Sequence, residues 1–242
     1  MDKCHIEVGT VITNLITIIP YFGEDLKLYI WGNFNIGSEA LNRFYTLHYL
    51  LPLLLLIPIF LHLYYVHKKG GNNKLGIKEN LIVFSRYYIY KDIMSFSLFV
   101  ILFIILIFIK PSSLGHVDNY IESNTLVTPS HIVPELYLLP YYTILRSIEE
   151  KRIGVILLVL SIFIFIFLPF IQSSILINLS FRPFYLNILI YFIFNYIYIG
   201  YMGTQLVLIP FLYINYFLTF FYFYFIISLI SLSFIEYIIF LI

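Results

Sequence analysis

Long apolar runs separated by short polar segments dominate the hydrophobic pattern of this chain. Several runs approach the ~20 residues that a helix needs to cross a bilayer. The pattern predicts five membrane-spanning helices, at residues 40–67, 92–110, 153–173, 184–202 and 207–235. The fifth run is longer than a bilayer requires, so we expect that helix to tilt or to extend beyond the membrane. The expected fold class is therefore an all-α membrane protein.

Short helices are expected outside the spans. Residues 8–20 are apolar, contain scattered Thr and Asn, and end at Pro20, which fits an interfacial helix better than a span. A second short piece follows Glu24 and Asp25, whose charges suit the first turn of a helix, although an ordinary loop is an equally good interpretation. Residues 134–147 predict a short helix that dips into the membrane without crossing it.

Basic side chains gather in the segment 68–91, between the first and second predicted spans. By the positive-inside rule this segment faces the matrix or its bacterial equivalent. The loop 111–152 lies on the opposite side and is less basic on balance. Five spans place the C-terminus on the side of the basic segment.

Composition supports the membrane class and excludes others. Hydrophobic residues make up 61% of the chain and charged residues 11%, and the formal net charge of +1 gives no electrostatic case for nucleic-acid binding. The single cysteine, Cys4, cannot form an internal disulfide. Ala40 is the one alanine among abundant Ile, Leu, Phe and Tyr, which suggests an AT-rich and therefore organellar genome.

Two histidines lie within the first predicted span. His48 and His62 are fourteen residues apart, so on a helix their imidazoles face nearly the same side, roughly 21 Å apart along the axis. Ionisable side chains at lipid depth usually have a functional reason. Two aligned imidazoles near opposite leaflets suit axial ligands for two haems stacked across a bilayer. For either histidine alone, a hydrogen bond to a neighbouring helix is the alternative.

Several motifs resemble those of the cytochrome b family, in the family's order and at nearly its spacing. They are residues 43–52, 62–73, 87–92, 126–137, 144–148 and 181–183, then Gly200, Gln205 and Pro210, with 9–15 and 30–32 nearer the start. The resemblance covers almost the whole chain. It implies two b-type haems, with His48 ligating the low-potential haem iron and His62 the high-potential one.

The resemblance divides the chain into four parts. Residues 1–39 would be interfacial helices on the intermembrane-space side, and residues 40–110 the haem-ligating helix, the matrix loop and the next span. Residues 111–152 would form the quinol-site loop and its short helix. Residues 153–242 would be three C-terminal transmembrane helices.

The family's first three transmembrane helices, which carry the two partner histidines, are expected before Gly9 and have no counterpart here. The resemblance thus implies the C-terminal part of a split or N-terminally shortened cytochrome b. Its implied partners are an N-terminal cytochrome b fragment with the other two haem histidines, the Rieske iron–sulfur protein, cytochrome c1, other complex III subunits and membrane lipid. The assembly would be a dimeric complex in the mitochondrial inner membrane, with no nucleic acid.

The motif Pro-Glu-Leu-Tyr at 134–137 resembles the family's Pro-Glu-Trp-Tyr at the quinol oxidation site. Glu135 would accept the quinol proton, since a carboxylate that rotates between quinol and water can act as a general base. Tyr137 and Tyr142 would line the same site. Leu136 departs from the family's Trp, which affects packing but not the proton step. An ordinary interfacial carboxylate is the alternative for Glu135.

On the basic side, His67 and Asp92 match the family's quinone reduction site. They would bind the quinone carbonyls and donate protons, and Asn72 would replace a serine that many members use. The alternatives are a membrane-interface histidine and a first-turn aspartate that favours the helix dipole. Arg43, near His48, would pair with a haem propionate or anchor the helix at the interface.

The implied function is that of cytochrome b in ubiquinol–cytochrome c reductase, respiratory complex III, which passes electrons from ubiquinol through two b haems in a proton-translocating Q-cycle. Without the N-terminal helices the chain is expected to be inactive as an enzyme. One alternative is a non-catalytic membrane scaffold fragment, which the retained histidine pair argues against. The other is a transporter or ion-pump subunit, which should carry charges in the middle of several spans, whereas the last three spans are nearly free of them.

Overall fold

The computed structural model describes residues 3–70, 83–115, 120–121, 133–171, 174 and 178–241, and in this part of the chain it contains helices and turns but no β-strand. The longer helices are α1 (Lys3–Ile16), α2 (Gly23–Trp31), α3 (Ser38–Lys69), α4 (Ile89–Ile109), α5 (Leu139–Arg146), α6 (Lys151–Ile171), α7 (Pro183–Gly203) and α8 (Phe211–Leu241). Short helical turns are η1 (Phe84–Tyr88), η2 (Pro111–Leu114) and η4 (Leu179–Phe181).

Five of these elements are long and apolar enough to cross a membrane, which confirms the predicted number of spans. They are α3, η1 with α4, α6, α7 and α8. The described helices also confirm the all-α class and the two short helices before the first span. Glu24 and Asp25 lie in the first turn of α2, as expected for acidic side chains at the positive end of a helix dipole.

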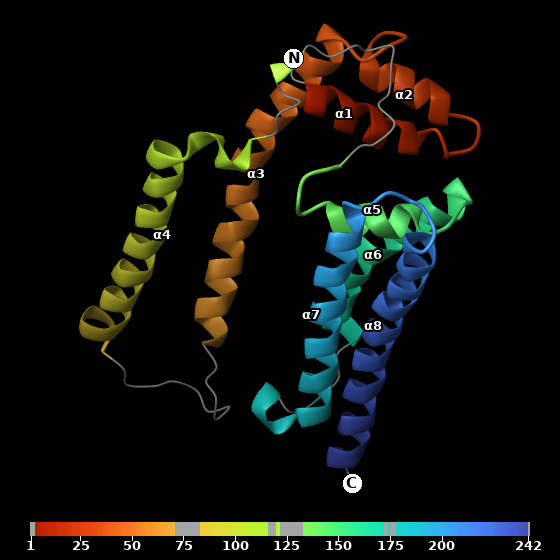
Figure 1. Cartoon of the computed structure of the whole chain (residues 1–242). Helices are drawn as coiled ribbons and strands as arrows, with labels where there is room; N and C mark the ends of the chain where they lie inside the picture. Colours follow the sequence, from red (N-terminus) through yellow and green to blue (C-terminus); the bar gives the residue numbers. More distant parts are fainter. Residues whose placement is uncertain are drawn as a thin grey trace. The chain divides into compact units, whose positions relative to one another are not determined.

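The chain separates into two compact units (Figure 1). The first comprises Met1–Val11 and Lys27–Thr128. Its small core joins the end of α2 to the start of α3 through the buried side chains of Trp31, Ile36 and Ala40. Beyond this core α3 has few neighbours, because from residue 41 to residue 68 only Phe44 is even half-buried.

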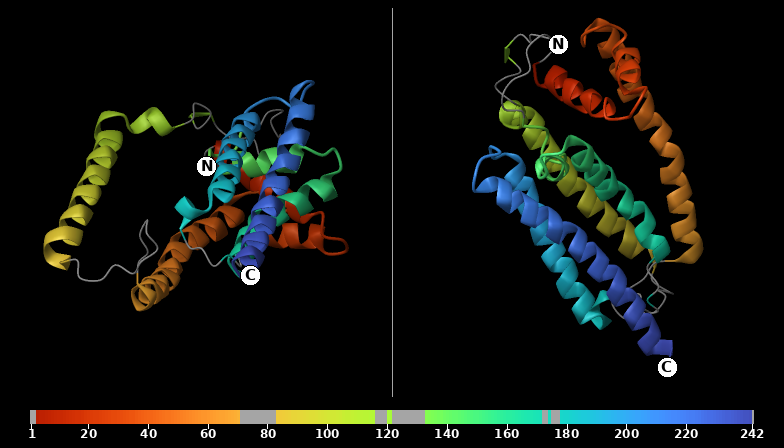
Figure 2. Two further views of the ribbon diagram at one scale, coloured as in Figure 1. Left: turned by 90° about the horizontal axis from the view of Figure 1, so that it is seen from below. Right: turned by 90° about the vertical axis from the view of Figure 1, so that its right-hand side faces the viewer.

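The second unit comprises Ile12–Leu26 and Pro129–Ile242, and its spans α6, α7 and α8 form a bundle (Figure 2). Its core contains Ile144, Ile199, Tyr222 and Ile226. Polar side chains also bond between the spans, since the Tyr222 hydroxyl donates to the carbonyl oxygen of Ser161 at 2.9 Å. Such bonds satisfy polar groups that lipid cannot. Helix α5 packs against all three spans.

Several predicted helix boundaries are wrong, and prolines explain two of them. The interfacial helix expected over residues 8–20 is α1, which covers Lys3–Ile16. The short helix begins at Leu139 instead of residue 134, and residues 136–138 form a turn closed by the Leu138 N–H to the Glu135 carbonyl oxygen at 2.8 Å. Pro140 lies in the first turn of α5, where the missing N–H has no helical partner to lose. The last span begins at Phe211, directly after Pro210, and continues to Leu241, so 207–235 started too early and ended too soon.

Candidate functional site

His48 and His62 lie on one unbroken helix, because α3 continues through Pro52 and Pro58. Both imidazoles are exposed, and neither has a hydrogen-bond partner among the described residues. Within the same residues no group of three or more His, Cys, Asp or Glu side chains gathers in one place, so each histidine would offer a single ligand. Two separate imidazoles on one helix, with no hydrogen-bond partner in the described part of the chain, fit one ligand position of each of two haems.

Arg43 is engaged by the end of α2. Its Nη1 donates to the carbonyl oxygens of Tyr29 and Ile30, the second at 3.1 Å, and its guanidinium lies 5.5 Å from the centroid of the Tyr29 ring. A cation on the last carbonyls of a helix is favoured by the helix dipole. Arg43 therefore anchors the start of α3 to α2, and its pairing with a haem propionate stays a prediction.

His67 is exposed near the end of α3, and Asp92 is exposed in the first turn of α4. Neither side chain has a hydrogen-bond or ion-pair partner in the described part of the chain, and the structure does not bring the two together there. Asn72 lies outside the described residues, so its role also stays a prediction.

The motif of residues 134–137 lies outside α5, in the extended segment and turn that precede the helix. Glu135 is exposed, and Leu136 and Tyr137 are 82% and 71% exposed. Tyr142 lies on α5 and is half-buried. The Glu135 carboxylate has no partner among the described residues, which leaves it able to rotate.

Helix α5 is held against α7 by a buried threonine. The Thr143 hydroxyl donates to the carbonyl oxygen of Ile199 at 2.9 Å, and the Leu139 carbonyl oxygen is a second acceptor at 3.0 Å. Gly203 permits the approach, because a Cβ there would lie 2.8 Å from the Leu139 carbonyl oxygen. Helix α5, which follows the candidate quinol motif, is thus bound to α7 by a hydrogen bond and a close backbone contact.

Arg146, in the last turn of α5, bonds the end of α7. Its Nη2 donates to the carbonyl oxygens of Met202 at 2.5 Å and Gly203 at 2.9 Å. Its guanidinium carbon lies 4.7 Å from the centroid of the Tyr142 ring, within cation–π range, while its buried Nε has no partner in the described structure. Burial lowers the pKa of Arg146 from its usual value, and Tyr142 opposes this.

At the other end of the bundle, Arg182 precedes α7 and is 1% exposed. Its Nε lies 2.5 Å from a carboxylate oxygen of Glu236 on α8, and its Nη2 donates to the Ser233 hydroxyl at 2.9 Å. Its guanidinium carbon also lies 3.9 Å from the centroid of the Tyr185 ring. This cluster joins α7 to α8 and satisfies a buried charge.

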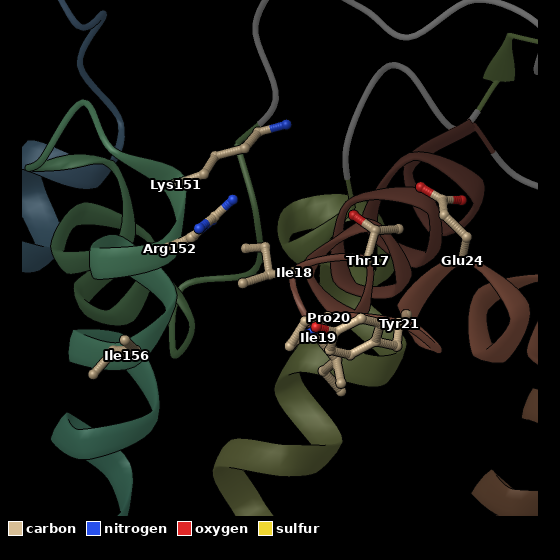
Figure 3. A pocket seen from close by; sticks show the side chains of 10 residues that line it. Thr17, Ile18, Ile19, Pro20, Tyr21, Glu24, Lys151, Arg152 and Ile156 are labelled. Carbon is tan, nitrogen blue, oxygen red and sulfur yellow. The ribbon is translucent and has the colours of Figure 1, made fainter.

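A cavity of about 700 Å³ lies between the turn that follows α1 and the start of α6 (Figure 3). Thr17, Ile18 and Glu24 line one side, and Lys151 and Arg152 extend from the first turn of α6 on the other. Sequence reasoning assigned these two basic side chains no role. It also missed Arg146, whose acceptors lie more than fifty residues away in the chain.

Comparison with known protein families gives two matches. Residues 2–116 match the family described as cytochrome b (N-terminal)/b6/petB. Residues 122–223 match the family described as cytochrome b (C-terminal)/b6/petD. Together the two matches run along most of the chain.

Curated relatives include the cytochrome b of Dictyostelium citrinum, 43% identical over 84% of this chain and 53% of its own length. That of Yarrowia lipolytica is 42% identical over 88% of this chain and 56% of its own length. That of Rickettsia prowazekii is 41% identical over 86% of this chain and 54% of its own length. The chain thus spans about half the length of these relatives.

Among solved structures, a chain of a hyperthermophilic respiratory complex III is similar to this one with a TM-score of 0.87. The two are 26% identical, and the match covers 98% of this chain and 64% of the other. The sequence and structure comparisons therefore agree.

Proposed function

This chain belongs to the cytochrome b family, and we propose that it is the C-terminal part of cytochrome b in respiratory complex III of the mitochondrial inner membrane. As a subunit of this ubiquinol–cytochrome c oxidoreductase it takes part in electron transfer from ubiquinol through two b haems in a proton-translocating Q-cycle. The observation that carries the proposal is the pair of exposed imidazoles, His48 and His62, on the single helix α3, neither with a partner among the residues that the structure describes.

Each histidine holds one haem in this proposal, His48 the low-potential and His62 the high-potential group. When bound, the haems supply one-electron transfer across the membrane. The chain contributes the placement of the two imidazoles on nearly the same side of one helix, about four helical turns apart. A ring nitrogen that binds iron leaves the other free to take a hydrogen-bond acceptor, which fixes the ring.

The second axial imidazole of each haem comes from an N-terminal cytochrome b fragment. The chain's histidines offer one ligand apiece, and the curated relatives are about twice as long as the part matched here. In this proposal the chain has no enzyme activity unless those N-terminal helices are present. The Rieske protein, cytochrome c1 and the other subunits of a dimeric complex complete the assembly.

Quinol is oxidised beside α5. Glu135 accepts a quinol proton and passes it to water, because it is exposed on a turn and free to rotate. Tyr137 and Tyr142 flank the substrate. On the opposite side of the membrane His67 and Asp92 hold the quinone carbonyls and donate protons, with Asn72 beside them. The basic segment after α3 faces the matrix.

An absorbance spectrum of the purified complex tests the proposal. Reduced-minus-oxidised spectra should show two b-type components, and mass spectrometry of the intact subunits should find a chain that carries the first three transmembrane helices. A complex that contains this chain but lacks b-type bands would support the scaffold alternative instead. A spectrum with both components but no N-terminal chain, and no longer form of this one, would refute the split arrangement.

A further inference from the structure

We propose that Arg146 is a positioning residue for quinol oxidation: by binding the end of α7 and the Tyr142 ring together, it holds Tyr142 and the Glu135 turn in one arrangement. This inference rests on the proposed function, because it takes Tyr142 and Glu135 as the groups that meet quinol. Arg146 acts through Tyr142 and does not touch the substrate itself.

Arg146 is bound to the end of α7. Its Nη2 has two hydrogens, and the carbonyl oxygens of Met202 and Gly203 lie within hydrogen-bond distance of it, at 2.5 and 2.9 Å. These carbonyls end α7, where the helix dipole is negative, so a guanidinium is favoured there. The Met202 oxygen also accepts from the Gln205 N–H at 3.1 Å, and Arg146 adds a second donor to it. The end of α7 is the support against which α5 is placed.

The same guanidinium also makes a cation–π contact with Tyr142. The guanidinium carbon lies 4.7 Å from the centre of the Tyr142 ring, and the two residues are four apart on α5, which places them on one face of the helix. The buried Nε of Arg146 gains no partner among the described residues. The position of the side chain is therefore set by the α7 carbonyls and the ring, and Tyr142 is held by the group that bonds α7.

Two backbone hydrogen bonds connect Tyr142 to Glu135 through Leu138. The Tyr142 N–H donates to the Leu138 carbonyl oxygen at 2.9 Å, and the Leu138 N–H donates to the Glu135 carbonyl oxygen at 2.8 Å. A shift of Tyr142 is thus passed to the turn that carries Glu135. Reactions that depend on placed groups lose up to about a hundredfold in rate for a displacement of about 1 Å.

The test is a double-mutant cycle on the assembled complex in native membranes, with rates normalised to haem b content. Arg146→Met and Tyr142→Leu should each lower kcat/KM for quinol by about 10- to 100-fold. If Arg146 acts through Tyr142, Arg146→Met should lower kcat/KM less than about twofold further in the Tyr142→Leu background. If the double variant instead shows the product of the two single losses in kcat/KM, the inference is overturned.

Thr143→Val is the matched control, because it also weakens the contact between α5 and α7 but leaves Arg146 and Tyr142 in place. It should lower the thermal midpoint of the complex while changing kcat/KM less than about threefold. An equal loss of kcat/KM would assign the effect to the seating of α5 as a whole and overturn a specific role for Arg146.

Arg146→Lys keeps the charge but loses the planar guanidinium that bonds two carbonyls at once. It replaces Arg146→Met in the double-mutant cycle if the complex with Arg146→Met does not assemble. Its expected effect is smaller, and it should again be absent when Tyr142 is Leu. If Tyr142→Leu alone leaves kcat/KM unchanged with both haem spectra intact, the quinol site itself is wrongly placed on α5. That result would refute the proposed site, whereas additivity would refute only the role of Arg146.

Discussion

Arg182 and Glu236 form an ion pair at 2.5 Å that joins the residue before α7 to the last third of α8. The guanidinium is 1% exposed and the carboxylate side chain 16% exposed, so water screens the pair weakly. The Ser174 hydroxyl adds a hydrogen bond to the same carboxylate oxygen at 3.1 Å. The pair holds two spans together at the end of the bundle opposite α5.

Removing one member of this pair should destabilise the complex strongly. Glu236→Leu leaves the Arg182 guanidinium buried without its counter-charge, which typically costs about 3–5 kcal/mol. The double variant Arg182→Met/Glu236→Leu should recover most of that loss, because no charge stays buried. Thermal unfolding of the solubilised complex measures both. Equal losses in the single and double variants would show that the pair contributes packing and not charge compensation.

Two glycines of α7 provide a matched pair of substitutions. Gly203→Ala should lower stability by about 1–3 kcal/mol, because the new Cβ would lie 2.8 Å from the backbone oxygen of Leu139 and would push α5 away. Gly200→Ala places its Cβ 3.5 Å from Pro140, an ordinary contact, and should leave stability unchanged or slightly higher. Thermal midpoints that fall equally for both would contradict the close approach of α5 to α7.

His62→Leu should remove the high-potential haem and leave the low-potential haem reducible by quinol. The reason is that the two imidazoles lie about four helical turns apart, so the loss of one leaves the other ligand in place. Redox difference spectra of mutant membranes report the two components. Tyr64→Leu, an exposed substitution two residues along α3, is the control and should retain both. Equal loss of both haems in His62→Leu would indicate misassembly.

Glu135→Gln should slow quinol oxidation by roughly 10²–10⁴ while the haems assemble normally, because glutamine keeps the shape of the side chain but cannot accept a proton. Pre-steady-state haem reduction, with quinone reduction blocked, measures this step. Glu150→Gln, an exposed carboxylate after α5, is the control and should be neutral. An unchanged rate in Glu135→Gln across the pH range would remove this carboxylate from the mechanism.

The sequence predicted the spans well because the length of an apolar run must match the thickness of the bilayer that the helix crosses. Residues 153–173 were expected where α6 occupies Lys151–Ile171. The expectation failed where prolines decide the start of a helix, at α5 and α8, because hydropathy treats Pro140 and Pro210 as parts of their runs. Neither proline interrupts the apolar pattern, yet both fix where the helix hydrogen bonds begin.

The candidate sites divide in the same way. The placement of His48 and His62 on one helix could be predicted from sequence, because it depends only on the helical period, and their role as haem ligands stays a prediction. Arg146 could not, because its acceptors are backbone carbonyls and every residue has one. The resemblance includes Arg146 in a matching motif, but the pairing with Met202 and Gly203 exists only once α5 lies on α7. Side chains that bind a distant helix end give no local pattern.

The outward-facing surface of α3 has a consequence for genetics. Side chains of α7 and α8 pack on one another within the second unit, whereas those of α3 beyond Phe44 are exposed within the described part of the first unit. A defect caused by a substitution between α7 and α8 should therefore be repaired by second-site suppressors in this same gene. Suppressors of substitutions on the exposed length of α3 should instead map to genes for other subunits or for lipid synthesis, the molecules that would cover that surface in the proposed complex.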